Sequence, residues 1–374
     1  MSQAFPPDPP DPISAVTHPD PYPYYARLVA EAPFQQHDGL WVAASAEAVT
    51  AVLTSQLCRV RPPAEPVPKA LLGSPAAEIF RRLVRMNDGP WQQDLKRAVM
   101  AALGSIDGAK AAEPSREWAG RLPAEPAGIA FQLPACVIGS LLGVAEDDLP
   151  RLAGLVGDFA PALAPGSSPE QVERGREAAG HLLDLFRALP AEGLLGTLSR
   201  EAREADQDEI VANAIGFLFQ AYDSTAGLIG NALVALARHP ELRDQALSPG
   251  FLPEVLRCDP PVQNTRRFVA WNGFVAGRAV QEGDAILVVL AAANRDPAAN
   301  PSPDRFDIFR EQRRLFTFGL GPHACPGETL ATTIAKAGIE RLLEAGLDVD
   351  GLAENVIYRP SANGRIPLLP QGDR

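Results

Sequence analysis

The sequence predicts a mainly α-helical fold with a minor β-sheet region, built as a single domain over residues 1–374. Segments with the apolar spacing of amphipathic helices occupy most of the chain, whereas strand-like stretches are short and, apart from one over 39–42, clustered between residues 267 and 291. No internal repeat and no linker divides the chain. With 46% hydrophobic and 21% charged residues, the chain has the composition of a globular protein that buries a substantial core.

The N-terminal half alternates predicted helices with proline-rich breaks. The expected elements are a short helix after the proline-rich residues 19–25, a strand over 39–42, and helices over 46–53, 78–103, 134–163 and 169–189. Asp88-Gly89-Pro90 interrupts the helical pattern over 78–103, because glycine and proline break helices.

The longest predicted helix covers residues 206–238. Asp206 and Glu209 stand in the capping-box relation at its start, and His239-Pro240 stops it. One face is continuously apolar and the other faces carry few charges, so we expect this helix to run buried through the centre of the domain. Strands over 267–275 and 285–291, an irregular tract over 294–315 and a helix over 326–345 complete the prediction.

Charge and cysteine usage exclude several classes of protein. The net charge of −12 provides no basic excess for binding nucleic acid. No apolar run is long enough to span a membrane and the N-terminus has no secretion-signal pattern, so a cytoplasmic protein without a membrane partner is expected. The four cysteines lie far apart and form no Cys-x-x-Cys pair, which disfavours a disulfide framework or a structural zinc site.

One cysteine, Cys325, lies in a loop of unusual composition, Phe-Gly-Leu-Gly-Pro-His-Ala-Cys-Pro-Gly, over residues 318–327. The glycines allow turn geometry and close approach to a flat partner. We expect Pro326 in the first turn of the following helix, where the helix N-terminus and backbone N–H groups stabilise a thiolate. A lone thiolate in a stiff loop suits an axial ligand of haem iron better than zinc or an iron–sulfur cluster.

Two alternatives exist for this loop. Cys325 could be a buried, inert cysteine in a glycine turn, which is how we interpret Cys58, Cys136 and Cys258. Gly319, Gly321 and Ala324 also fit a dinucleotide-binding pattern loosely, but no apolar strand precedes them and no βαβ unit surrounds them.

The loop resembles the haem-binding signature of the cytochrome P450 family, Phe-x-x-Gly-x-x-x-Cys-x-Gly, through Phe318, Gly321, Cys325 and Gly327. The resemblance covers roughly residues 20–370 and implies the P450 helical fold. It implies a haem b whose iron is bound by Cys325, with Phe318 and Gly319 at the cofactor. His323 matches the basic residue that hydrogen-bonds a haem propionate in the family.

Further propionate contacts follow from the same resemblance. Arg267 matches an arginine that meets a propionate, with Arg266 as its rival. Bacterial members place His-x-x-x-Arg on a helix where this chain has Gln92 and Lys96. Lys96 still supplies a charge, and Gln92 offers a neutral donor. The indole N–H of Trp91 is an alternative partner.

Glu254 and Arg257 match the Glu-x-x-Arg pair of the family. At this spacing both side chains share a helix face and can form an ion pair, although such pairs are common on exposed helices. In the family the pair holds the cysteine loop in place, and we expect Arg305 to complete the network.

The central helix departs from the family pattern Ala-Gly-x-Asp/Glu-Thr. Gln220 and Ala221 begin the segment, Asp223 keeps the acid, and Ser224 replaces the usual threonine, with Thr225 following. An acid and an alcohol in a buried, locally distorted helix can relay protons to bound dioxygen. The three residues 223–225 are therefore the catalytic candidates, and Ala221 a cofactor contact. The alternative is that Asp223 and Ser224 only satisfy backbone groups.

The resemblance implies a bacterial-type haem-thiolate monooxygenase that uses O2 on a small organic substrate, in secondary metabolism. Few charges occur over 210–230, which favours a largely apolar substrate. Ferredoxin and ferredoxin reductase are the implied electron donors. The rivals are a peroxide-using enzyme, one that couples, desaturates or nitrates its substrate, and a non-catalytic haem protein.

Overall fold

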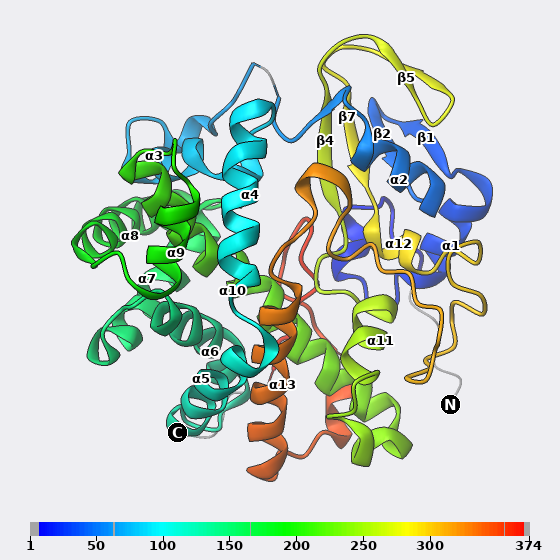
Figure 1. The fold of residues 1–374 in the computed structure, drawn as a ribbon. Helices are drawn as coiled ribbons and strands as arrows, with labels where there is room; N and C mark the ends of the chain where they lie inside the picture. Colours follow the sequence, from blue (N-terminus) through cyan, green and yellow to red (C-terminus); the bar gives the residue numbers. More distant parts are fainter. Residues whose placement is uncertain (1–6, 63, 165, 355, 370–374) are drawn as a thin grey trace. The chain divides into compact units, whose positions relative to one another are not determined.

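The structure is a computed structural model that describes residues 7–62, 64–164, 166–354 and 356–369, mostly as helix with a small sheet region, as predicted (Figure 1). The chain folds as two units, each assembled from segments far apart in sequence. The first unit draws on residues 7–59, 230–324 and 348–369, and the second on 60–229 and 325–347. Among the described residues, no helix combines the length and hydropathy needed to cross a membrane.

The first unit contains the sheet, with the strand order β1-β2-β7-β4-β3, and a separate β5-β6 hairpin. Its strands are β1 (Phe34–His37), β2 (Leu40–Ala43), β3 (Cys58–Arg59), β4 (Thr265–Val269), β5 (Gly273–Val275), β6 (Arg278–Val280) and β7 (Ala285–Val288). β2 and β7 pair in parallel, whereas the other neighbours pair antiparallel. Val42 and Leu287 pack into one hydrophobic cluster and Ala43 and Ile286 into another, so both faces of the sheet are buried.

Four short helices accompany the sheet in this unit: α1 (Tyr22–Glu31), α2 (Ala46–Thr54), α11 (Phe251–Cys258) and α12 (Leu290–Asn294). The strand predicted over 285–291 is wrong in its second half, because β7 ends at Val288 and α12 follows. Ala291–Ala293 favour helix, since alanine has the highest helix propensity, whereas the apolar run alone resembles a buried strand.

The second unit is helical. Its helices are α3 (Pro75–Arg82), α4 (Pro90–Gly104), α5 (Gly108–Arg121), α6 (Pro126–Leu141), α7 (Leu149–Ala162), α8 (Pro169–Ala188), α9 (Gly193–Glu201), residues 207–229 of α10 (Gln207–Arg238), and α13 (Glu328–Glu344). The predicted break at Asp88-Gly89-Pro90 separates the 3-10 helix η3 (Val84–Met86) from α4. We did not predict α5, whose pattern Pro114 interrupts, or α9.

α10 confirms the prediction of a long capped helix. The Asp206 N–H donates to Glu209 Oε2 at 2.9 Å, and the Glu209 N–H donates to Asp206 Oδ1 at 2.7 Å. The middle of the helix is mostly buried, but Phe217 and the five consecutive residues 220–224 are only half-buried. Among these, Phe217, Gln220, Ala221 and Ser224 follow the spacing i, i+3, i+4 and i+7, so they form one stripe along the helix.

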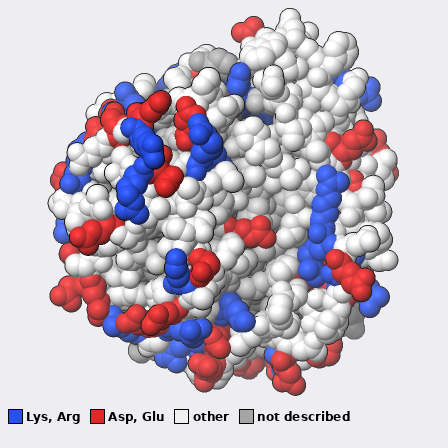
Figure 2. Space-filling model, in the orientation of Figure 1, with Lys and Arg blue, Asp and Glu red and all other residues white. Residues whose placement is uncertain are grey.

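Charged side chains are of mixed sign at the surface. Figure 2 shows Lys and Arg side chains interspersed with Asp and Glu over the described part of the visible face. This distribution agrees with the net charge of −12. It does not resemble the basic face that phosphate backbones attract.

Candidate functional site

Cys325 lies two residues before Gly327, the N-cap of α13. The helix begins at Glu328, so the prediction that Pro326 lies in its first turn is wrong; the chain completes the cysteine turn before the helix starts. The prediction of a backbone N–H directed at the sulfur is confirmed, because the Gly327 N–H donates to Cys325 Sγ at 3.4 Å. Such a donor stabilises negative charge on the sulfur.

Electrostatics separate Cys325 from the other cysteines. Cys58, Cys136 and Cys258 are buried, and burial raises the thiol pKa of Cys136 to about 11 and of Cys258 to about 12. The side chain of Cys325 is exposed, yet enough protein surrounds it that burial raises its pKa. The Gly327 N–H and the cations Lys96 and Arg85 act in the opposite direction. An accessible sulfur facing positive charge is suited to bind a metal as thiolate.

The surroundings of Cys325 fit a haem better than a metal held by several side chains. Over the described ranges, no group of three or more His, Cys, Asp or Glu residues could hold a metal ion. A metal at Cys325 therefore has one protein ligand of these types, which is the situation of a haem iron with an axial thiolate. Lys96 in the same unit adds a cationic group of the kind that binds haem carboxylates.

α4 carries Gln92 and Lys96, the two residues predicted to contact a haem propionate. Lys96 is half-buried, and its burial lowers its pKa while the nearby Cys325 raises it. Gln92, one turn earlier, is 2% exposed. The alternative prediction, that the indole N–H of Trp91 contacts the propionate, is wrong, because this N–H donates to Glu209 Oε1 at 2.9 Å. Arg85 was not predicted as a site residue, but it lies close enough to Cys325 for the two groups to shift each other's pKa.

The first unit carries Phe318, Gly319 and His323 of the cysteine loop. Gly319 and Gly321 both have φ of +67°, which a side chain disfavours. A Cβ on Gly321 would lie 3.0 Å from the carbonyl oxygen of Leu53, so the loop packs closely against α2. Phe318 and Gly319 are half-buried, as is His323.

Arg267 and its rival Arg266 lie on β4 and point to opposite sides of it. Arg267 is buried at 6% exposure, whereas Arg266 is exposed. The Arg267 guanidinium donates to the Arg266 carbonyl at 2.8 Å. Strand alternation therefore turns Arg267, and not Arg266, toward the interior of the first unit.

Asn294 links the segment before the cysteine loop to α11. Its side-chain oxygen accepts the Phe316 N–H at 2.7 Å, and its amide donates to Thr317 Oγ1 at 2.8 Å. The Thr317 hydroxyl in turn donates to the Leu256 carbonyl at 2.7 Å. These buried bonds fix residues 316–317 before the chain enters the loop.

The predicted Glu254–Arg257 pair is present and fully buried, with Arg257 Nη2 2.8 Å from Glu254 Oε1. Arg305 is wrong as the third member, because its guanidinium is 74% exposed and only its carbonyl takes part. Arg310 and Arg313 complete the network, at 3.3 and 2.8 Å from the Glu254 carboxylate. Hydrogen bonds from the arginines outweigh burial and lower the pKa of Glu254 to about 2.

The catalytic candidates lie on α10. The segment is α-helical over its whole length, so the expected local distortion does not interrupt it. The Ser224 hydroxyl donates to the Gln220 carbonyl at 2.9 Å, and Asp223 is half-buried. Thr225 is 1% exposed, and its Oγ1 has no hydrogen-bond partner in the described part of the chain. Ala221 lies on the half-buried stripe with Ser224.

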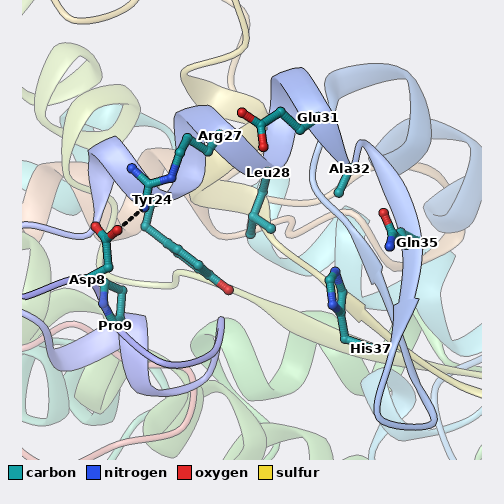
Figure 3. Close-up of a pocket in the computed structure, with 9 residues that line it drawn as sticks. All are labelled: Asp8, Pro9, Tyr24, Arg27, Leu28, Glu31, Ala32, Gln35 and His37. Atoms are coloured by element: carbon teal, nitrogen blue, oxygen red, sulfur yellow. Dashed lines mark hydrogen bonds and ion pairs between the residues drawn. The ribbon is translucent and has the colours of Figure 1, made fainter.

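A separate hollow of about 420 Å³ lies beside α1 in the first unit (Figure 3). Tyr24, Arg27 and Leu28 line it, and Arg27 forms a 2.5 Å ion pair with Asp8 there. None of the predicted site residues lines this hollow. It is therefore distinct from the surroundings of Cys325.

Comparisons with known proteins agree with this geometry. A sequence model described as Cytochrome P450 matches residues 249–345, which include Glu254, Arg267 and Cys325. The Vitamin D(3) 25-hydroxylase of Pseudonocardia autotrophica is 35% identical over 62% of this chain and 60% of its own length. The 6-deoxyerythronolide B hydroxylase of Saccharopolyspora erythraea is 31% identical over 62% of this chain and 61% of its own length. The chain thus matches about three fifths of these relatives.

The fold is similar over a larger share of the chain. A solved structure of the mixed-function P450 MycG is 26% identical, covers 93% of this chain and 95% of its own, and has a TM-score of 0.74. The family match contains the cysteine loop and the buried Glu254–Arg257 pair, and the structural match extends to the helices of both units. In sequence and in fold, the chain is similar to bacterial members of the cytochrome P450 family.

Proposed function

We propose that the protein is a haem-thiolate monooxygenase that inserts one oxygen atom from O2 into a small, largely apolar organic substrate. The observation that carries this proposal is the environment of Cys325, an accessible sulfur that accepts the Gly327 N–H and faces Lys96 and Arg85. Two relatives are named as hydroxylases, which supports the same reaction class.

Cys325 would hold the iron of a haem b through its thiolate. When bound, the haem supplies the iron at which O2 and two electrons meet. Lys96 and Gln92 would contact one propionate, and Arg267 and His323 the other. Phe318, Gly319 and Ala221 would line the cofactor, because they offer apolar or small surfaces.

Asp223, Ser224 and Thr225 would hold and move protons on the substrate side. Ser224 already places its hydroxyl on the half-buried stripe, where it donates to the Gln220 carbonyl. Thr225 has a buried hydroxyl whose oxygen accepts no bond from another described residue. An acid with two neighbouring hydroxyls can pass a proton through an ordered water.

The electron donors would be a ferredoxin and its reductase, in the cytoplasm, as the family resemblance implies. Gln220 and Ser224 depart from the family pattern, and this departure favours a peroxide-using enzyme as the second candidate. Asp223 supports the monooxygenase, because a peroxide-driven reaction needs no proton delivery to O2.

Isotope incorporation separates the two candidates. Compounds that convert the bound iron from low to high spin are first selected from a panel of small organic molecules. Each is then incubated with the haem-loaded protein and either ferredoxin, ferredoxin reductase, NADPH as electron source and ¹⁸O2, or hydrogen peroxide alone. The proposal predicts one ¹⁸O atom in the product of the reductase-driven reaction. Product formed with peroxide but not with the reductase system would contradict it.

A further inference from the structure

Arg85, on the 3-10 helix η3, has no anionic partner among the described residues. It makes no hydrogen bond or ion pair with any residue that the structure describes. Burial lowers the pKa of Arg85, and among the described residues the charge of Cys325 raises it. Its guanidinium carries five donors, so a carboxylate that reaches it can accept several hydrogen bonds at once.

The backbone around Arg85 is fixed against α10. The Val84 N–H donates to Asn213 Oδ1 at 2.9 Å, and Asn213 Nδ2 donates to the Arg82 carbonyl at 2.9 Å. The Arg61 guanidinium donates to the Met86 carbonyl on the other side. These bonds therefore fix the position of η3, which connects α3 to α4 along the chain. Figure 1 labels the two flanking helices. A fixed backbone that carries a head group with no protein partner among the described residues is typical of a preformed binding residue.

Arg85 lies where the stripe on α10 begins. Asn213 anchors η3 to α10, and a Cβ on Gly216 would lie 3.0 Å from Leu83 Cδ2. The stripe follows within the next turn, starting at Phe217 and including Ala221. The side chain of Arg85 is exposed although protein surrounds it, so a ligand can reach its guanidinium. Arg85 thus lies at one end of this stripe, whose four members Phe217, Gln220, Ala221 and Ser224 carry no charge.

We infer that Arg85 binds the carboxylate of the substrate, so that the substrate is an organic acid with a largely apolar body. This inference rests on the proposed function and names the substrate class for it. The planar guanidinium can donate two parallel hydrogen bonds to a carboxylate. Haem also carries carboxylates, but the proposed propionate partners Lys96, Gln92, Arg267 and His323 leave Arg85 to the substrate.

Calorimetric titration of the haem-loaded protein with decanoate and 1-decanol tests the inference. These two probes share chain length and differ in charge. We expect the wild-type protein to bind decanoate about tenfold to hundredfold more tightly than the alcohol, which is the range for a charge-assisted pair. Arg85→Gln should remove this preference and Arg85→Lys should keep part of it. Arg97→Gln, an exposed change on α4, is the matched control and should bind as wild type.

Two outcomes would overturn the inference. One is an equal affinity of the wild-type protein for both probes, or a preference that survives in Arg85→Gln. The other is loss of haem from Arg85→Gln with an unchanged preference in the fraction that retains it, which would assign Arg85 to a propionate. The reduced, carbon-monoxide-bound spectrum of the same samples reports thiolate ligation independently. Failure of the oxygenase proposal is therefore distinguishable from failure of the acid site.

Discussion

Replacing Glu254 by Gln tests whether the buried ion network holds the first unit together. Glu254 is 0% exposed and accepts hydrogen bonds from Arg257, Arg310 and Arg313, so the change leaves three guanidinium groups facing a neutral amide. Its pKa falls from 4.5 to about 2, and a difference of this size corresponds to about 3 kcal/mol. Removing one partner of a buried ion pair typically costs 3–5 kcal/mol, so we expect a loss of about 3 kcal/mol in the free energy of unfolding.

Urea unfolding followed by circular dichroism at neutral pH measures this loss. Glu311→Gln is the matched control, since Glu311 is exposed in the same tract, and it should change the free energy by less than about 0.5 kcal/mol. The folded-state pKa of Glu254 is depressed, so its contribution is complete above pH 4.5 and is lost as the pH falls toward 2. The difference between wild type and Glu254→Gln must shrink over that window. A loss below about 1 kcal/mol at neutral pH would refute the reasoning.

Three further predictions concern other parts of the chain. Ser224→Ala should lower coupled, reductase-driven product formation by about 100-fold while peroxide release rises, and unchanged coupling would disprove the proton relay. Asn213→Ala should cost about 2 kcal/mol, measured by denaturant unfolding, because it removes the buried partner of the Val84 N–H; an unchanged midpoint would contradict this. Arg365→Met should cost about 3–5 kcal/mol in the same assay, because Asp259 loses its 2.7 Å ion pair inside the first unit; a loss within 1 kcal/mol would argue against it.

Strong local signals let the sequence predict much of the fold. The capping residues Asp206 and Glu209 predicted the start of α10 correctly, because capping depends on neighbours within one turn. The strand predicted to 291 failed after Val288, since an apolar run has no period that separates strand from helix. α5 escaped prediction because Pro114 interrupts its pattern, although the helix tolerates it.

Site residues that belong to a local motif could be predicted from the sequence. Residues that meet only through tertiary packing could not. The Cys325 loop and the Glu254–Arg257 pair have fixed local spacing. Arg310 and Arg313 meet Glu254 only through the irregular tract, so nothing local distinguished them from Arg305. No local signal distinguished Arg85, because Arg81 and Arg82 precede it in the same arginine-rich segment.

The central claim is that Cys325 binds haem iron as a thiolate. The most direct measurement is the absorption spectrum of the purified, reduced protein under carbon monoxide, with Cys325→His as the comparison. A thiolate opposite the bound gas shifts the Soret band strongly to the red, and imidazole ligation does not. We predict the red-shifted band in the wild-type protein and its absence in Cys325→His. A wild-type spectrum without that band, or a band that survives the substitution, would contradict the assignment.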